Sequence, residues 1–149
     1  MFKSTAEKFF SQSEKDRLKE AVVKAELDTS GEVRIHIDNV CKEDVLDRAA
    51  YIFKKLDMHK TEQRNGVLFY LAVKSKKFAI IGDSGINAVV PENFWDCIKE
   101  YLSSHFIKGE FTEGLCGGID MTGKQLKKYF PYQEDDINEL PDDISFGKN

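Results

Sequence analysis

Three short polar segments contain the side chains whose types and spacing could do chemistry. They are Thr29–Glu32, Arg64–Gly66 and Gly82–Asn87, and each contains at least one glycine. The carboxylate of Asp83 can ligate a hard divalent cation through its oxygens, and the planar guanidinium of Arg64 can clamp a phosphate. A bound cation can polarise a phosphoryl oxygen or activate water. These groups therefore indicate metal-assisted hydrolysis of a phosphate ester.

Each candidate residue has an expected role in that chemistry. Asp83 and Arg64 are expected to be catalytic. Asp83, Glu32 and Glu113 are expected to ligate Ca²⁺ or Mg²⁺. The expected substrate-binding residues are Ser30, Asn65, Ser84 and Asn87. A structural interpretation also stays open, because aspartate is common at turns and Arg64 could be the ion-pair partner of Glu62 or Asp83.

Other catalytic signatures are missing from the sequence. It contains neither a Gly-x-x-x-x-Gly-Lys-Ser/Thr phosphate loop nor a Gly-x-Ser-x-Gly nucleophile elbow. Its three histidines are far apart, and none lies in a zinc-binding arrangement. His36 is expected to contact a helix that covers its strand. The sequence therefore argues against P-loop enzymes, serine hydrolases and zinc enzymes.

The composition is that of an ordinary globular protein. Of its 149 residues, 41% are hydrophobic and 32% are charged, and the formal net charge is −4. A negative net charge argues against a nucleic-acid binder, which needs a basic face to displace counterions. The strongly apolar run over 67–73 is too short to span a bilayer. We expect a monomeric, cytoplasmic protein without a membrane span.

Seven segments have the pattern of a helix or a strand. Ser11 or Ser13 begins a helix that ends near Leu27, because Glu14 or Asp16 can complete a capping box. The strand over 32–38 alternates apolar and polar side chains, which predicts one apolar face. The remaining expected elements are a helix over 42–56, strands over 67–73 and 77–82, a helix opened by Pro91, and a helix from Phe111 to about Lys128.

The order of these elements determines where the three polar segments lie. Strand, helix and strand make a βαβ unit, so the first two strands should be parallel. The short turn before residue 77 makes the third strand antiparallel to the second. The starts of the first two strands and the end of the third then share one edge of the sheet. We expect an α/β domain over 1–130, a three-layer α/β/α sandwich with a mixed sheet, followed by an acidic tail over 131–149.

Four motifs give the chain a resemblance to a known family. Thr29–Glu32 resembles the "TGAE" start of TPM domains, and Arg64–Leu68 is similar to their "NGVL" motif. Phe78–Ile86 resembles the family's strand that ends in glycines and a hydrophobic residue. Phe106–Leu115 follows the pattern F-x-x-G-x-(Y/F)-x-x-G-L. The resemblance covers about residues 12 to 128 and implies a compact α/β/α sandwich.

The resemblance also implies candidate activities. A plant member of the family is associated with acid phosphatase activity, and many relatives have proposed roles near membranes, to which a signal peptide and a transmembrane helix attach them. This sequence shows neither feature, so membrane roles are not carried over. We therefore expect a weak, divalent-metal-assisted phosphatase acting on phosphomonoesters. The alternative is a non-catalytic scaffold that binds a protein partner through the same edge or the acidic tail.

Overall fold

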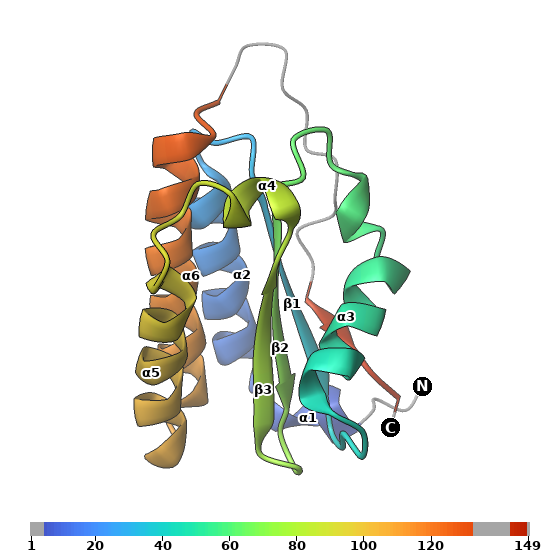
Figure 1. Ribbon diagram of the computed structural model, residues 1–149. Helices are drawn as coiled ribbons and strands as arrows, with labels where there is room; N and C mark the ends of the chain where they lie inside the picture. Colours follow the sequence, from blue (N-terminus) through green and yellow to red (C-terminus); the bar gives the residue numbers. More distant parts are fainter. Residues whose placement is uncertain (1–4, 133–143, 149) are drawn as a thin grey trace.

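The computed structural model describes residues 5–132 and 144–148 as helices packed around one mixed sheet (Figure 1). The four strands lie in the order β3-β2-β1-β4. The elements are α1 (Thr5–Phe9), α2 (Gln12–Glu26), β1 (Glu32–Asp38), α3 (Val45–Lys55), the 3₁₀ helix η1 (Met58–Lys60), β2 (Gly66–Ala72), β3 (Lys77–Gly82), α4 (Ser84–Asn87), α5 (Phe94–Ile107), α6 (Phe111–Tyr129) and β4 (Ser145–Phe146).

Side-chain caps determine where two of the helices begin. In α2 the hydroxyl of Ser11 accepts from the Glu14 amide, and the Glu14 carboxylate accepts from the Ser11 amide, which completes the expected capping box. In α3 the carboxylate of Asp44 accepts from the amides of Leu46 and Asp47. The helix expected from residue 42 therefore starts at residue 45, because the cap lies just before that position.

The sheet has the predicted chain directions. β1 and β2 are parallel, with Glu32 opposite Gly66. β2 and β3 are antiparallel, with Val67 opposite Gly82. The sequence did not predict β4, which pairs with β1 in parallel. Residues 144–148 of the expected acidic tail therefore return to the sheet, whereas residues 133–143 and 149 lie outside the described part of the chain.

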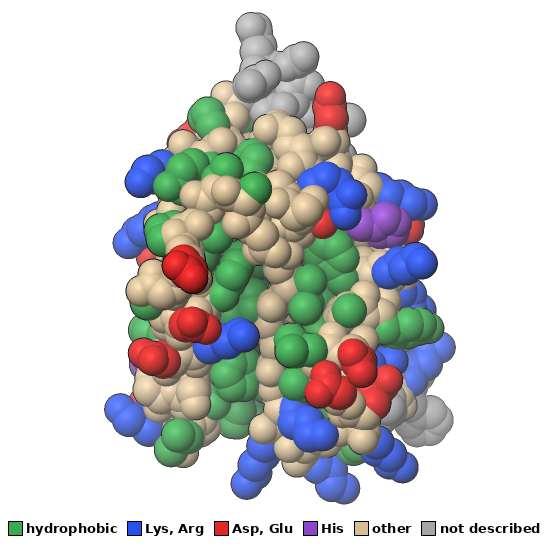
Figure 2. All heavy atoms as spheres, viewed as in Figure 1, with side chains coloured by type: hydrophobic (Ala, Val, Ile, Leu, Met, Phe, Trp, Pro, Cys, Tyr) green, Lys and Arg blue, Asp and Glu red, His purple; other side chains and the backbone are tan. Residues whose placement is uncertain are grey.

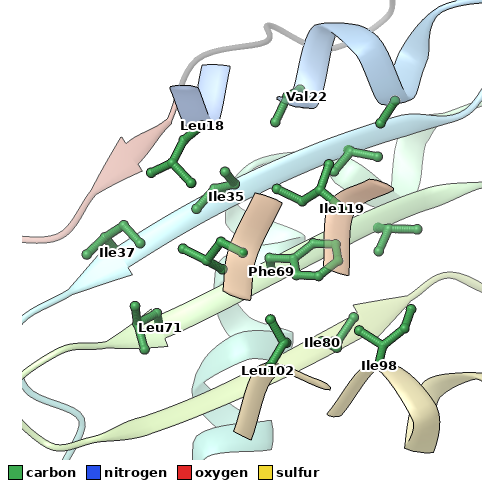
Figure 3. Packing of buried hydrophobic residues seen from close by; sticks show 14 of the residues in the cluster. Leu18, Val22, Ile35, Ile37, Phe69, Leu71, Ile80, Ile98, Leu102 and Ile119 are labelled. Carbon is green, nitrogen blue, oxygen red and sulfur yellow. The ribbon is translucent and has the colours of Figure 1, made fainter. Parts of the chain in front are cut away.

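Helices cover both faces of the sheet, as the three-layer prediction requires. On one face α2, α5 and α6 pack their apolar side chains against those of β1, β2 and β3 (Figure 3). Leu18 of α2, Leu102 of α5 and Ile119 of α6 are all at most 1% exposed in this cluster. On the opposite face, Ile52 of α3 packs with Leu68 and other residues of the sheet. Burial of these apolar surfaces is the main force that holds the layers together.

β1 has the predicted apolar face, formed by Val33, Ile35 and Ile37, but its polar face is covered as well, so all seven residues are buried. Arg34, His36 and Asp38 are at most 7% exposed. His36 bonds to Ser145 of β4 and to Asp38, and its ring stacks on Tyr70, so its described partners come from the sheet and not from a covering helix. Alternation in sequence showed which side chains share a face, but it could not show that the polar face would also be covered.

Candidate functional site

The three polar loops meet at one edge of the sheet, beside α4 (Figure 1). We call residues 29–32, 64–66 and 82–87 the three-loop edge. The amide of Gly85 donates to the carbonyl of Arg64 at 2.8 Å. The side chain of Gln63 donates to the hydroxyl of Ser30 at 3.0 Å. The convergence of the loops, inferred from strand directions, is therefore confirmed.

Arg64 and Asp83 form a two-point ion pair at the centre of this edge. Nε of Arg64 lies 2.7 Å from Oδ2 of Asp83, and Nη2 lies 2.8 Å from Oδ1. The Asp83 carboxylate also accepts from the Ser84 amide at 2.7 Å and caps α4. The Asp83 side chain is 7% exposed, whereas that of Arg64 is 51% exposed. Both structural interpretations that the sequence left open, a turn aspartate and an ion-paired arginine, are therefore confirmed.

The backbone fixes the position of this pair. Arg64 has a φ of 52°, in the left-handed region that non-glycine residues rarely adopt. Its carbonyl oxygen accepts from the amides of Gly85 and Ile86. A Cβ on Gly85 would lie 2.0 Å from the carbonyl oxygen of Gln63, so only glycine fits there. The hydrogen bonds and the charge of Asp83 raise the pKa of Arg64 further above its usual range, so its guanidinium is always charged.

The side chains of two expected substrate-binding residues are engaged in hydrogen bonds within the protein. Asn65 is 1% exposed, and its side-chain amide donates to Ser30 at 3.3 Å. Asn87 donates to the carbonyl of Gly82 and accepts from the indole of Trp95. Ser30 is half-buried and Ser84 is exposed. Of the four, Ser84 and the hydroxyl of Ser30 are the groups best placed to meet a ligand.

The expected metal ligands do not all come together. Glu32 is buried in β1, at 3% exposure. Glu113 lies in the first turn of α6 and pairs with Arg17 at 3.2 Å. The opposite end of α6 reaches the three-loop edge, where Thr29 donates to the carbonyl of Leu126. At 1.5 Å per residue, Glu113 is about 20 Å further down the helix. Its inclusion in the site is therefore wrong.

The donor groups near Asp83 do not suit a resident divalent cation. Both Asp83 oxygens accept hydrogen bonds from Arg64, and one also accepts from Ser84. Within residues 5–132 and 144–148, no group of three or more His, Cys, Asp or Glu side chains could hold a metal ion. Ca²⁺ and Mg²⁺ need several oxygen ligands. We therefore derive no catalytic step that uses a metal.

A second polar cluster, centred on Asp38, was missed by the sequence analysis. Asp38 is fully buried and accepts from Tyr70 at 2.6 Å, from Arg48 at 2.9 Å and from His36 at 3.1 Å. His36 also bonds to Ser145 at 2.7 Å. The cluster lies at the end of β1, away from the three-loop edge. The signal in the sequence was the run of three polar residues on one face of an otherwise apolar strand.

The partners of Asp38 keep it charged despite its burial. Burial raises the pKa of Asp38, but the hydrogen bonds from His36, Arg48 and Tyr70 outweigh this effect and hold the pKa well below its usual range. Burial and the bond to Asp38 raise the pKa of Tyr70 well above its usual range. Because Asp38 and His36 are buried, we interpret this cluster as structural: its hydrogen bonds link β1, β2, α3 and β4.

Comparison with solved structures defines the class of protein. The fold is shared with the NMR structure of the BA42 protein from the psychrophilic bacterium Bizionia argentinensis, which is 45% identical and superposes with a TM-score of 0.86. That match covers 93% of this chain and 96% of BA42. The N-terminal domain of the cg2496 protein from Corynebacterium glutamicum is 8% identical, with a TM-score of 0.66, and the match covers 89% of this chain and 82% of that domain. At that identity the likeness shows the fold alone.

The family follows from a profile match. The profile described as the TPM domain, with the label TPM phosphatase, matches residues 4–125. The chain belongs to the TPM domain family. None of the curated proteins compared with it matches. Within the described ranges, no helix combines the length and the apolar character needed to cross a membrane.

Proposed function

We propose that this chain binds phosphomonoesters at the three-loop edge, with Arg64 as the residue that contacts the phosphate. The observation that carries the proposal is the side-on attachment of Arg64 to Asp83 through Nε and Nη2. This attachment leaves the outer side of the guanidinium, including Nη1, directed away from Asp83. Among the described residues Nη1 has no hydrogen-bond partner, and half of the side chain is exposed.

An arginine held in this way is suited to bind an anion. A guanidinium and a phosphate match each other through two parallel hydrogen bonds, which are stronger than bonds between neutral groups. Asp83 holds the guanidinium, and the Gly85 amide holds the backbone of Arg64, before the ligand arrives. Less conformational entropy is then lost on binding. The hydroxyls of Ser30 and Ser84 can supply further hydrogen bonds.

The same geometry favours binding over turnover. Asp83 was expected to act in catalysis, but its carboxylate is already engaged by Arg64 and by the Ser84 amide. A general base must reach the proton that it removes. Engagement of Asp83 therefore supports the non-catalytic alternative. The ligand of such a module would carry a phosphate monoester, whether it is a small molecule or a modified protein.

Weak phosphatase activity is the second candidate. The family profile bears the label TPM phosphatase, and a fixed arginine can stabilise the charge of a phosphoryl group in its transition state. A divalent cation would have to arrive with the substrate, because the described acids do not form a cage for it. Three further properties stay predictions from the sequence: a cytoplasmic location, a monomeric state and a protein partner.

Binding can be tested by an NMR titration with phenyl phosphate. We expect amide shifts at the three-loop edge, and Arg64→Gln should weaken binding roughly tenfold or more, because a charge-assisted bond is lost. Arg17→Gln is the matched control, since Arg17 is 50% exposed and also pairs with a carboxylate, but at the far end of α6. Equal affinity in wild type and Arg64→Gln would show that the phosphate site is elsewhere.

Hydrolysis needs a separate measurement. Turnover of p-nitrophenyl phosphate should be measured with Mg²⁺, with Ca²⁺ and with a chelator, in wild type and in both arginine variants. Activity that requires the cation and falls only in Arg64→Gln would support the phosphatase. If phenyl phosphate binds but p-nitrophenyl phosphate is not hydrolysed under any of the three conditions, the result would exclude the phosphatase and support a non-catalytic binding module.

A further inference from the structure

A pocket lies at the end of the molecule opposite the three-loop edge. It is bounded by the end of β2, the start of β3 and the connection between α5 and α6, and its volume is about 530 Å³. Its apolar lining comes from Leu71, Phe78, Phe106, Ile107 and Phe111. Figure 2 shows hydrophobic side chains at the surface between α5 and the strands. Pockets for small ligands have volumes of roughly 300–1,000 Å³ and are mostly apolar.

An unbroken series of aromatic rings forms one wall of this pocket. The rings of Phe78 and Phe106 are 5.2 Å apart, and those of Phe106 and Phe111 are 5.1 Å apart. Phe9 continues the series, 5.2 Å from Phe111. Because neighbouring rings hold one another in place, the wall is formed before any ligand binds. Phe9 is 41% exposed and Ile107 is 84% exposed, so apolar surface continues outside the pocket.

The polar groups of the pocket are few and of one charge sign. Lys76 is the charged residue of the lining, and Ser103 contributes a hydroxyl group to it. Lys76 has a φ of 56° in the tight turn between β2 and β3. The acid in the adjoining α5–α6 connection, Glu110, bonds to His105 at 2.9 Å. A Cβ on Gly109 would meet no described atom within 4 Å, so the mouth is open on that side.

We propose that this pocket binds a small anionic amphiphile, such as a fatty carboxylate, with the apolar chain along the phenylalanines and the anion near Lys76. The apolar lining of the pocket favours a hydrocarbon chain, since removal of that chain from water is favourable. A lysine and a hydroxyl at the same pocket favour a negative head group over a neutral or positive one. This site is separate from the phosphate-binding edge and does not depend on it.

The head-group preference can be measured with three ligands of equal chain length. Octanoate, 1-octanol and octylammonium should be titrated below their aggregation limits, with ¹⁵N-HSQC spectra as the readout. We expect octanoate to bind most tightly and octylammonium least, with shifts at Lys76, Ser103 and residues 106–111. Equal affinity for octanoate and octylammonium would overturn the proposal, and so would shifts that lie outside the pocket.

Two substitutions separate the charge from the cavity. Lys76→Gln should weaken octanoate roughly threefold to fivefold, as expected for a partly exposed ion pair, and should leave octanol unchanged. Lys74→Gln, in the same turn but outside the lining, is its control. Ser103→Trp fills the pocket from the half-buried face of α5 and should abolish binding of both ligands. Full octanoate affinity in a folded Ser103→Trp protein would overturn the proposal.

Discussion

The hydroxyl of Tyr70 donates a 2.6 Å hydrogen bond to Oδ2 of the fully buried Asp38. The two residues lie on neighbouring parallel strands, and Arg48 of α3 donates to the same oxygen at 2.9 Å. The Asp38 carboxylate therefore connects both strands to α3, which packs on this face of the sheet. Through His36 the same carboxylate is linked to Ser145 of β4.

Removal of the Asp38 charge should destabilise the fold strongly. We expect Asp38→Asn to lower the free energy of unfolding by about 3 kcal/mol, because the half-buried charge of Arg48 would lose the buried carboxylate that compensates it. Urea denaturation measures this loss. Asp57→Asn is a suitable control, since Asp57 pairs with Lys60 on the surface and its loss should cost less than about 1 kcal/mol. Equal losses in the two variants would contradict the role assigned to Asp38.

Asp38 should also make the protein sensitive to acid. Its folded-state pKa is lowered, so its stabilising effect is present above the unfolded pKa of about 3.9 and is lost as the pH falls toward the folded value. The unfolded chain binds more protons over this range, and the free energy of unfolding decreases. Urea denaturation between pH 6 and pH 3 should give a steeper decline for wild type than for Asp38→Asn. Parallel curves would exclude Asp38 as the source.

Gly85→Ala should disturb the three-loop edge directly. The new methyl group would collide with the carbonyl oxygens of Gln63 and Arg64, at 2.0 Å and 2.7 Å, and the backbone would have to move. We expect a loss of about 1–3 kcal/mol in unfolding free energy and a shifted Arg64 Nε resonance. Gly109→Ala is the control: its methyl group would meet no described atom within 4 Å, so the substitution strains only the backbone, at a φ of 78°. It should leave that resonance unchanged.

Ser145→Ala should loosen β4 without unfolding the domain. The substitution removes the 2.7 Å bond to His36, and the loss should be about 1 kcal/mol. The amide of Gly147, which donates to the carbonyl of Ile37 at 2.8 Å, should then exchange faster with deuterium. Amides at the centre of β2 should keep their protection. An unchanged exchange rate at Gly147 would show that the backbone hydrogen bonds between β1 and β4 are enough to hold β4 in place.

Local patterns in the sequence determined most of the elements. The capping box at Ser11 and Glu14, and the short turn before Lys77, depend on residues within a few positions of one another. For that reason α2, β2 and β3 were predicted within one or two residues of their observed bounds. The convergence of the three loops also followed from sequence, because strand directions are constrained by the connections between strands.

Only the tertiary structure decided what the polar side chains do. Asp83 was a candidate catalyst in the sequence, but its partner Arg64 lies 19 positions away and takes both of its oxygens. Glu113 was grouped with Asp83 by residue type, yet the length of α6 separates them. Burial of Asp38 depends on α3 and on β4, a strand of two residues that has no periodicity to detect. Sequence patterns report interactions between near neighbours, whereas ion pairs and burial depend on which distant segments pack together.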